Sequence, residues 1–131
     1  MRYASWFARA AAFLIDVLLF VAVLTIVNLS GVAELSDTAA YGAALAVLAV
    51  HGANRWYFGG RSGQSLGRKL VGIRLVWERG ERPIGTFPAF LRDLTHAVDT
   101  FALYIGWLFP LWDAKRQTFA DKISSTVVLK A

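Results

Sequence analysis

Two long apolar runs, joined by a short polar linker, dominate the first half of the chain. The first run extends from Phe7 to Leu29 and contains a single carboxylate, that of Asp16. The second run covers 38–58 and is rich in alanine and glycine. A helix of roughly 20 residues crosses the hydrocarbon core of a bilayer. The pattern therefore predicts a hairpin of two transmembrane helices, at 7–29 and 38–58.

Small residues recur every four positions in the second run. Gly42 precedes Ala46 by four residues, and Ala49 precedes Ala53 by the same interval. In lipid, this spacing lets two helix backbones approach closely. We therefore expect this face to pack against the first helix.

The third apolar region, 87–112, has a mixed character. Its first half places Arg92, His96 and Asp99 on one helical face. Its second half is apolar but only about 18 Å long as a helix, against a hydrocarbon core of roughly 30 Å. Two alternatives follow: the whole region crosses as one tilted helix, or it forms an interfacial unit that dips into the membrane and returns. We slightly favour the second, because the basic tail that follows suits the cytoplasmic side.

A short β element is expected between the second and third apolar regions. Apolar and charged residues alternate over 73–77, and a turn at Arg79-Gly80 leads into 82–84. This predicts a β-hairpin at the membrane surface. The β-prone tail at 125–130 could also pair with it. The fold class is thus an all-α membrane protein: two transmembrane helices, a third tilted or re-entrant helical region and short cytoplasmic β-hairpin elements, in one domain over 1–131.

Basic residues indicate the orientation of the hairpin. The linker at 30–37 has no Lys or Arg, whereas both flanking segments are basic. The positive-inside rule then places the N-terminus and the central segment in the cytoplasm. The N-terminal run is expected to be retained, because it is too long for a signal peptide and Asp16 interrupts it. The cations are Arg2 and Arg9 before the hairpin, and Arg55, Arg61, Arg68, Lys69, Arg74, Arg79 and Arg82 after the linker.

Composition narrows the range of partners. The net charge of +5 and the pI near 10.0 fit anionic lipid on the cytoplasmic face better than nucleic acid, because the cations adjoin apolar segments. Arg61, Arg68 and Lys69 are the expected contacts to lipid phosphate. The chain has no cysteine, which excludes disulfides and thiolate metal sites.

No pattern of residues predicts catalysis, a metal or a cofactor. The GxSxG string at 63–67 needs an α/β sheet with triad partners, and nothing here predicts such a sheet. His51 and His96 lack the HxxxH and HExxH spacings of zinc sites. We therefore expect a protein that is not an enzyme.

Asp16 is the residue that most needs an explanation. A charge at the centre of a membrane helix costs about 2.5–3.5 kcal/mol on insertion scales, so such residues usually face the protein interior. One interpretation is an ion or proton site within a polar cluster of Asp16, Arg92, His96 and Asp99. The other is a structural carboxylate that fixes how the helices pack. We slightly favour the structural role.

Three segments together resemble a known family. They are WFARAAAFLIDVLL at 6–19, GQSLGRKLVGIRLV at 63–76 and RQTFADKISSTVVL at 116–129. In this order they are similar to the RDD family of bacterial membrane proteins, named for one arginine and two aspartates. The resemblance implies that these residues are Arg9, Asp16 and Asp121. It also implies a small inner-membrane domain, for which transport of some ligand has been proposed.

Two functions are compatible with these observations. The first is a non-catalytic accessory or scaffold subunit that packs against other membrane proteins or against copies of itself, as its small size and Ala/Gly-rich helix suggest. The alternative is an oligomeric secondary transporter or cation/proton exchanger that uses Asp16.

Overall fold

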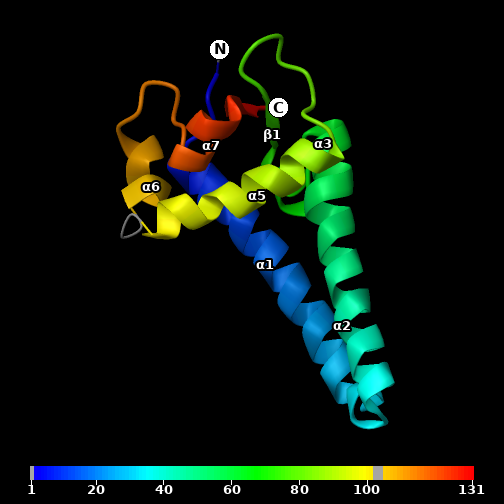
Figure 1. Cartoon of the computed structure of the whole chain (residues 1–131). Helices are drawn as coiled ribbons and strands as arrows, with labels where there is room; N and C mark the ends of the chain where they lie inside the picture. The colour runs from blue at the N-terminus through cyan, green and yellow to red at the C-terminus, as the bar shows by residue number, and fades with distance from the viewer. Residues whose placement is uncertain (1, 102–104) are drawn as a thin grey trace.

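The computed structural model in Figure 1 describes residues 2–101 and 105–131. Residues 6–58 form a helical hairpin, and the other described residues form a second part, here called the head. The first arm is α1 (Trp6–Leu29), whose N-terminus is capped by Ser5, with its hydroxyl accepting the N–H of Ala8. Within the described residues, α1 is the one helix long and apolar enough to cross a membrane. Only two of its residues are buried, so most of its apolar surface faces outward.

The second arm is not a regular α-helix throughout. After the 3₁₀ turn η1 (Val32–Glu34), α2 runs from Asp37 to Gly52 and passes into a π-helical segment, η2 (Ala53–Phe58), then into α3 (Gly59–Ser62). The 16 residues of α2 fall short of the roughly 20 that a perpendicular span needs. The predicted run at 38–58 is therefore helical, but its regular α-helical part is shorter than expected.

The face of α2 that packs against α1 differs from the predicted one. Ala43 and Val47 are its buried side chains, whereas Gly42, Ala46 and Ala49 are exposed. A Cβ placed on Gly42 would meet no atom within 4 Å. The second helix does pack against the first, as expected, but not through the Gly42–Ala46 face. Spacing by four residues cannot select one face of a helix in which small residues occur on several.

The head contains a two-stranded antiparallel sheet built from distant segments. Strand β1 (Ile73–Trp77), which follows α4 (Leu66–Val71), pairs with β2 (Thr126–Lys130) in the register Leu75↔Val128. The predicted local hairpin is wrong. Residues 82–84 form no strand, and the Trp77 N–H donates once, to the Arg82 carbonyl (2.9 Å). Pro83 has no N–H to extend a ladder on that edge. The C-terminal strand pairs with the opposite edge of β1, where the Glu78 N–H donates to the Ser125 carbonyl (2.9 Å), as the β-prone tail at 125–130 allowed.

The third apolar region forms several short helices. Helix α5 (Thr86–Phe101) crosses α1 beside the sheet, and α6 (Ile105–Leu108) leaves in another direction before η3 (Phe109–Leu111) and α7 (Phe119–Ser124) (Figure 1). The region is therefore not one straight crossing helix. Residues 102–104, which belong to the predicted region, lie outside the described residues. The arrangement fits the interfacial alternative, and the number of membrane spans is treated below as a proposal.

The hydrophobic core lies in the head, where the sheet meets the start of α1. Its buried members come from the N-terminal segment, β1, β2 and α5. Helix α4 packs tightly against α1, because Gly67 places its backbone against the Ala12 carbonyl. The core residues are Ala4, Ala12, Ile73, Leu75, Ile84, Ala89 and Val128.

The contact between α4 and α1 leads to a first prediction. In Gly67→Ala, the new methyl would overlap the Ala12 carbonyl and lie 3.0 Å from Asp16 Oδ1. We expect a loss of about 1–3 kcal/mol in unfolding free energy, typical of overpacking. Thermal unfolding in detergent measures it. The matched control is Gly42→Ala, which removes a glycine from an open helical site and should be neutral or slightly stabilising. Equal melting temperatures for the two variants would contradict the close approach.

Candidate functional site

Asp16 is buried at the base of the hairpin and accepts four hydrogen bonds. Its donors are Asn54 Nδ2 (2.9 Å), Arg55 Nη1 (2.8 Å), Ser65 Oγ (2.6 Å) and the Gly67 N–H (2.9 Å). The residue is 2% exposed. The carboxylate therefore joins three elements: α1, η2 and the start of α4. A buried carboxylate with this many donors is a satisfied structural group.

Two consecutive residues of the π-helical segment η2 reach the Asp16 carboxylate. In a regular α-helix, successive side chains point about 100° apart. In η2, Asn54 and Arg55 both donate to Asp16, and the Asn54 carbonyl oxygen of the side chain accepts the Leu66 N–H (2.8 Å). Single turns of π-helix often occur at functional positions. Here the turn links the hairpin to α4.

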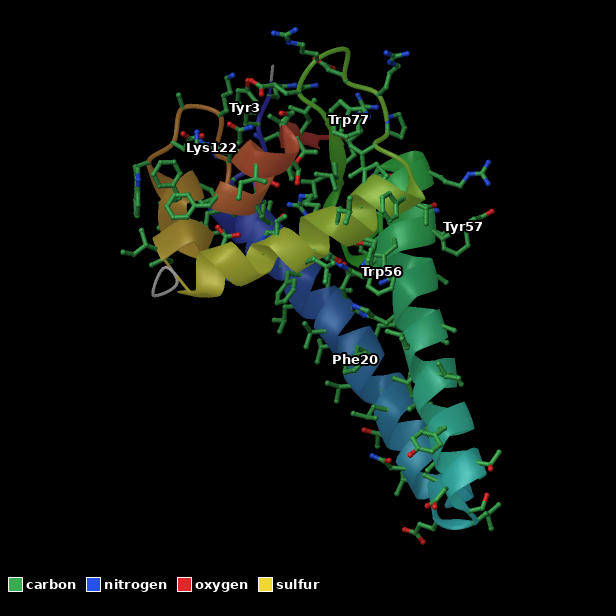
Figure 2. All side chains as sticks on the ribbon, viewed as in Figure 1. Tyr3, Phe20, Trp56, Tyr57, Trp77 and Lys122 are labelled. Atoms are coloured by element: carbon green, nitrogen blue, oxygen red, sulfur yellow. The ribbon has the colours of Figure 1, made fainter. Side chains whose placement is uncertain are left out.

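Arg55 also binds a second carboxylate, that of Asp93 on α5. Its Nη2 and Nε donate to Asp93 at 2.9 and 3.3 Å, and the indole N–H of Trp56, labelled in Figure 2, donates to the same carboxylate at 2.9 Å. Burial raises the pKa of Asp93, but the charges of Arg55 and Arg92 and the hydrogen bonds from Arg55 and Trp56 together outweigh it and lower this pKa to about 2. Asp93 is therefore ionised at neutral pH and holds α5 to the hairpin.

A second ion-pair cluster centres on Asp121, which is fully buried in α7. Arg9 from α1 and Arg92 from α5 both bind it, Arg92 through Nε at 2.7 Å. Asp121 also forms a capping box with Thr118 at the start of α7. Burial raises the pKa of Asp121, but the two guanidinium groups outweigh that effect and hold it far below its ordinary value. The cluster ties α7 to α1 and α5.

Asp99 and His96 form a third polar contact, again on α5. Asp99 accepts the backbone N–H of Phe119 (2.9 Å) and lies 2.7 Å from His96 Nδ1. The His96 ring stacks on Trp107 with centroids 4.3 Å apart. Burial and the charge of Arg92 lower the pKa of His96 despite the opposing effect of Asp99. His96 is thus expected to be neutral at pH 7, donating from Nδ1 to Asp99.

The predicted polar residues divide among these contacts. Asp16 binds Arg55, whereas Arg92 binds Asp121, and His96 binds Asp99. The cluster expected from Asp16, Arg92, His96 and Asp99 is therefore distributed over three pairings. The first two are linked, because Arg92 Nη1 lies 3.8 Å from Asp93, which Arg55 also binds. Two residues assigned by family resemblance, Arg9 and Asp121, are in direct contact.

The expected lipid-phosphate contacts also lie in different environments. Arg61 and Lys69 are exposed, whereas Arg68 is buried. The three residues therefore do not form one surface site. The burial of the Arg68 side chain is considered separately below.

Four residues of the site were not identified from the sequence as partners: Asn54, Arg55, Ser65 and Asp93. One pattern could have revealed the first two, because Asn54-Arg55 are adjacent polar residues in an otherwise apolar run. Ser65 carried no such pattern. It lies in a loop segment, and only the packing of α4 against α1 brings its hydroxyl to Asp16.

Ion pairs with arginine are the main contacts of the carboxylates at this site. In 2–101 and 105–131, no group of three or more His, Asp or Glu side chains is placed to hold a metal ion. The carboxylates of Asp16, Asp93 and Asp121 are each bound by arginine. These charge pairs run between residues of the head and residues of the hairpin.

Comparison with known proteins places these residues in a family context. The RDD family model matches residues 3–125. A proline-rich antigen homolog of Mycobacterium tuberculosis is 44% identical over 75 residues, covering 55% of this chain and 31% of that protein. The proline-rich antigen of Mycobacterium leprae is 44% identical over 77 residues, covering 56% and 31%. The chain thus spans less than a third of the length of these relatives. No solved structure matches it.

Proposed function

We propose that this chain, which belongs to the RDD family, is a non-catalytic accessory domain of the bacterial inner membrane that packs against a larger membrane protein. The observation that carries the proposal is that the buried Asp16 carboxylate already has an ion-pair partner and a full set of hydrogen bonds. Its charge is matched by Arg55, and its oxygens accept four hydrogen bonds. An exchanger would need a carboxylate that gains and loses its cation, and protonating Asp16 would break this network.

The proposed topology is multi-pass, with the N-terminus and the head on the cytoplasmic side. Support comes from the distribution of charge: the head carries Arg2, Arg61 and Lys69, whereas the far end of the hairpin carries Glu34 and Asp37. This arrangement suits the positive-inside rule and anionic lipid on the cytoplasmic face. On this proposal, η2 completes the second crossing that α2 begins, and α3 belongs to the head.

The surface offered to a partner is the small-residue face of α2, formed by Gly42, Ala46 and Ala49. These residues are exposed, because α1 contacts the neighbouring face at Ala43 and Val47. Membrane helices associate closely through faces of this kind. The proposed partner is therefore a transmembrane helix of another protein, or of a second copy of this chain.

A mild-detergent purification followed by native mass spectrometry tests the proposal. We expect the wild-type chain to co-isolate with a membrane protein at fixed stoichiometry. The double variant Gly42→Leu/Ala46→Leu should lose it while keeping its melting temperature. Ala44→Leu, an exposed small residue on the other side of the α1 contact, is the matched control and should retain the partner. A wild-type protein that is strictly monomeric and isolated alone would refute the accessory role.

The exchanger hypothesis makes a different prediction and is tested in proteoliposomes. Cation-dependent proton flux with the wild type, and none with a folded Asp16→Asn variant, would replace the accessory role with transport. Equal flux for both proteins would remove Asp16 as the coupling site.

A further inference from the structure

A cavity of about 400 Å³ lies where the start of α1 meets α5, α6 and the sheet. Its apolar wall includes Trp6, Phe13 and Trp107, and four arginines also line it: Arg9, Arg55, Arg68 and Arg92. Among the described residues that line it, none carries a carboxylate. The cavity therefore combines a hydrophobic wall with a concentration of positive charge.

Three of the four arginines have a carboxylate partner, and Arg68 does not. Arg55 binds Asp16 and Asp93, while Arg9 and Arg92 bind Asp121. The remaining buried carboxylate, Asp99, is occupied by His96 and by backbone N–H groups of α7.

Arg68 is nevertheless almost completely buried. It is 5% exposed, and its Nη1 is enclosed without a hydrogen-bond partner. Among residues 2–101 and 105–131 its side chain makes no hydrogen bond or ion pair. Burial and the nearby charges of Arg55 and Arg92 lower the pKa of Arg68, yet arginine remains protonated in proteins. A buried, unpaired guanidinium is costly, and such a group calls for an anion.

We propose that this cavity binds a phosphate group, with Arg68 as its main ligand. A guanidinium offers paired N–H donors that match two phosphate oxygens. The neighbouring arginines, although paired, add positive potential from the same side. The inference is independent of the accessory role proposed above.

The apolar wall suggests that the phosphate belongs to an amphiphile. Phe13 and Leu14 line the cavity and are 46% and 58% exposed, so the wall continues onto the outer apolar surface of α1. A hydrocarbon chain attached to the phosphate could follow this surface into the bilayer. A free phosphate would use the same arginine but gain nothing from the wall, and the two sources can be distinguished experimentally.

The experiment measures one-to-one binding to the delipidated protein by native mass spectrometry. The probes are dioctanoyl phosphatidylglycerol, dioctanoyl phosphatidylcholine and inorganic phosphate. We expect one copy of the phosphatidylglycerol to bind, and Arg68→Gln to weaken it on the order of tenfold or more. Arg61→Gln is the matched control, because it removes an exposed arginine that contacts Tyr57 outside the cavity. It should leave the one-to-one affinity within about twofold.

The outcomes distinguish a lipid phosphate from a free phosphate, and both from the absence of a phosphate site. Binding of phosphatidylglycerol without competition by inorganic phosphate supports a lipid ligand, whereas tight binding of inorganic phosphate supports a soluble one. Both require the loss in Arg68→Gln. Equal losses in Arg68→Gln and Arg61→Gln, or no one-to-one binding by any anion, would overturn the proposal.

Melting temperatures in the absence of anion provide a second readout. If Arg68 serves a ligand, Arg68→Gln and Arg68→Met relieve an unpaired charge and should melt at or above the wild-type temperature. If Arg68 were only structural, both variants would melt lower, and this result would overturn the proposal even where binding is also lost. Arg68→Lys, which keeps the charge, should recover part of the affinity.

Discussion

Replacing Asp121 with asparagine is expected to lower the free energy of unfolding by about 3–5 kcal/mol, the usual cost of removing one partner from a buried ion pair. The variant removes the fully buried charge that Arg9 binds, and it leaves Arg92 only a longer contact to Asp93 (3.8 Å). It also weakens the capping box of α7. In a domain of this size we expect a fall in melting temperature on the order of 10 °C or more.

Thermal unfolding in detergent measures the effect, with Asp113→Asn as the matched control. Asp113 precedes α7, pairs with the exposed Lys122 and accepts the backbone N–H groups of Lys115 and Gln117 through one oxygen. Asparagine keeps an oxygen that can accept these two bonds, so the loss of the charge should cost no more than about 1 kcal/mol. A double-mutant cycle adds a second check. Arg9→Gln should cost much less in the Asp121→Asn background than in the wild type, because the charge it pairs with is already absent. Additive effects would show that the ion pair contributes little.

Asp16→Asn is the other substitution for which we expect a large effect. Asparagine keeps the size of the side chain but removes the charge that faces Arg55, and its NH₂ group meets donors where an oxygen accepted them. We again expect a loss of about 3–5 kcal/mol. The measured quantity is the unfolding midpoint in detergent or in a denaturing surfactant titration.

The control for Asp16→Asn is Glu34→Gln, which neutralises an exposed carboxylate in the loop of the same hairpin. It should leave the midpoint unchanged within about 0.5 kcal/mol. A wild-type midpoint for Asp16→Asn would mean that the four hydrogen bonds contribute little to stability, and it would remove the main support for the accessory role. The result thus bears on function as well as on the fold.

Asp16 and Asp121, the residues changed in these two variants, each connect several elements of the fold. Asp16 joins the hairpin to α4, and Asp121 joins α1 and α5 to α7. Both carboxylates stand far from their partners in the sequence, so neither pairing reflects local structure. Their hydrogen bonds and ion pairs connect elements whose outward-facing surfaces are apolar.

The sequence by itself determined the features that depend on residues close together in the chain. The long apolar run at 6–29 had to form a helix that avoids water, and a lone carboxylate within it, Asp16, had to face protein. Ser5 and Thr118 cap the helices they precede through hydrogen bonds to residues three positions away. Arginine and aspartate at Arg9, Asp16 and Asp121 also carried the family resemblance, which the match over residues 3–125 confirmed.

Only the tertiary structure decided which groups meet. The partner of Asp16 proved to be Arg55, because the fold places Asn54 and Arg55 of η2 beside one carboxylate on α1. The β-prone tail does pair with β1, as expected, but only the packing of the head decides that it takes the edge opposite the one Arg82 contacts. Periodicity places a residue on a face of its own element, but the packing of elements determines what lies opposite that face.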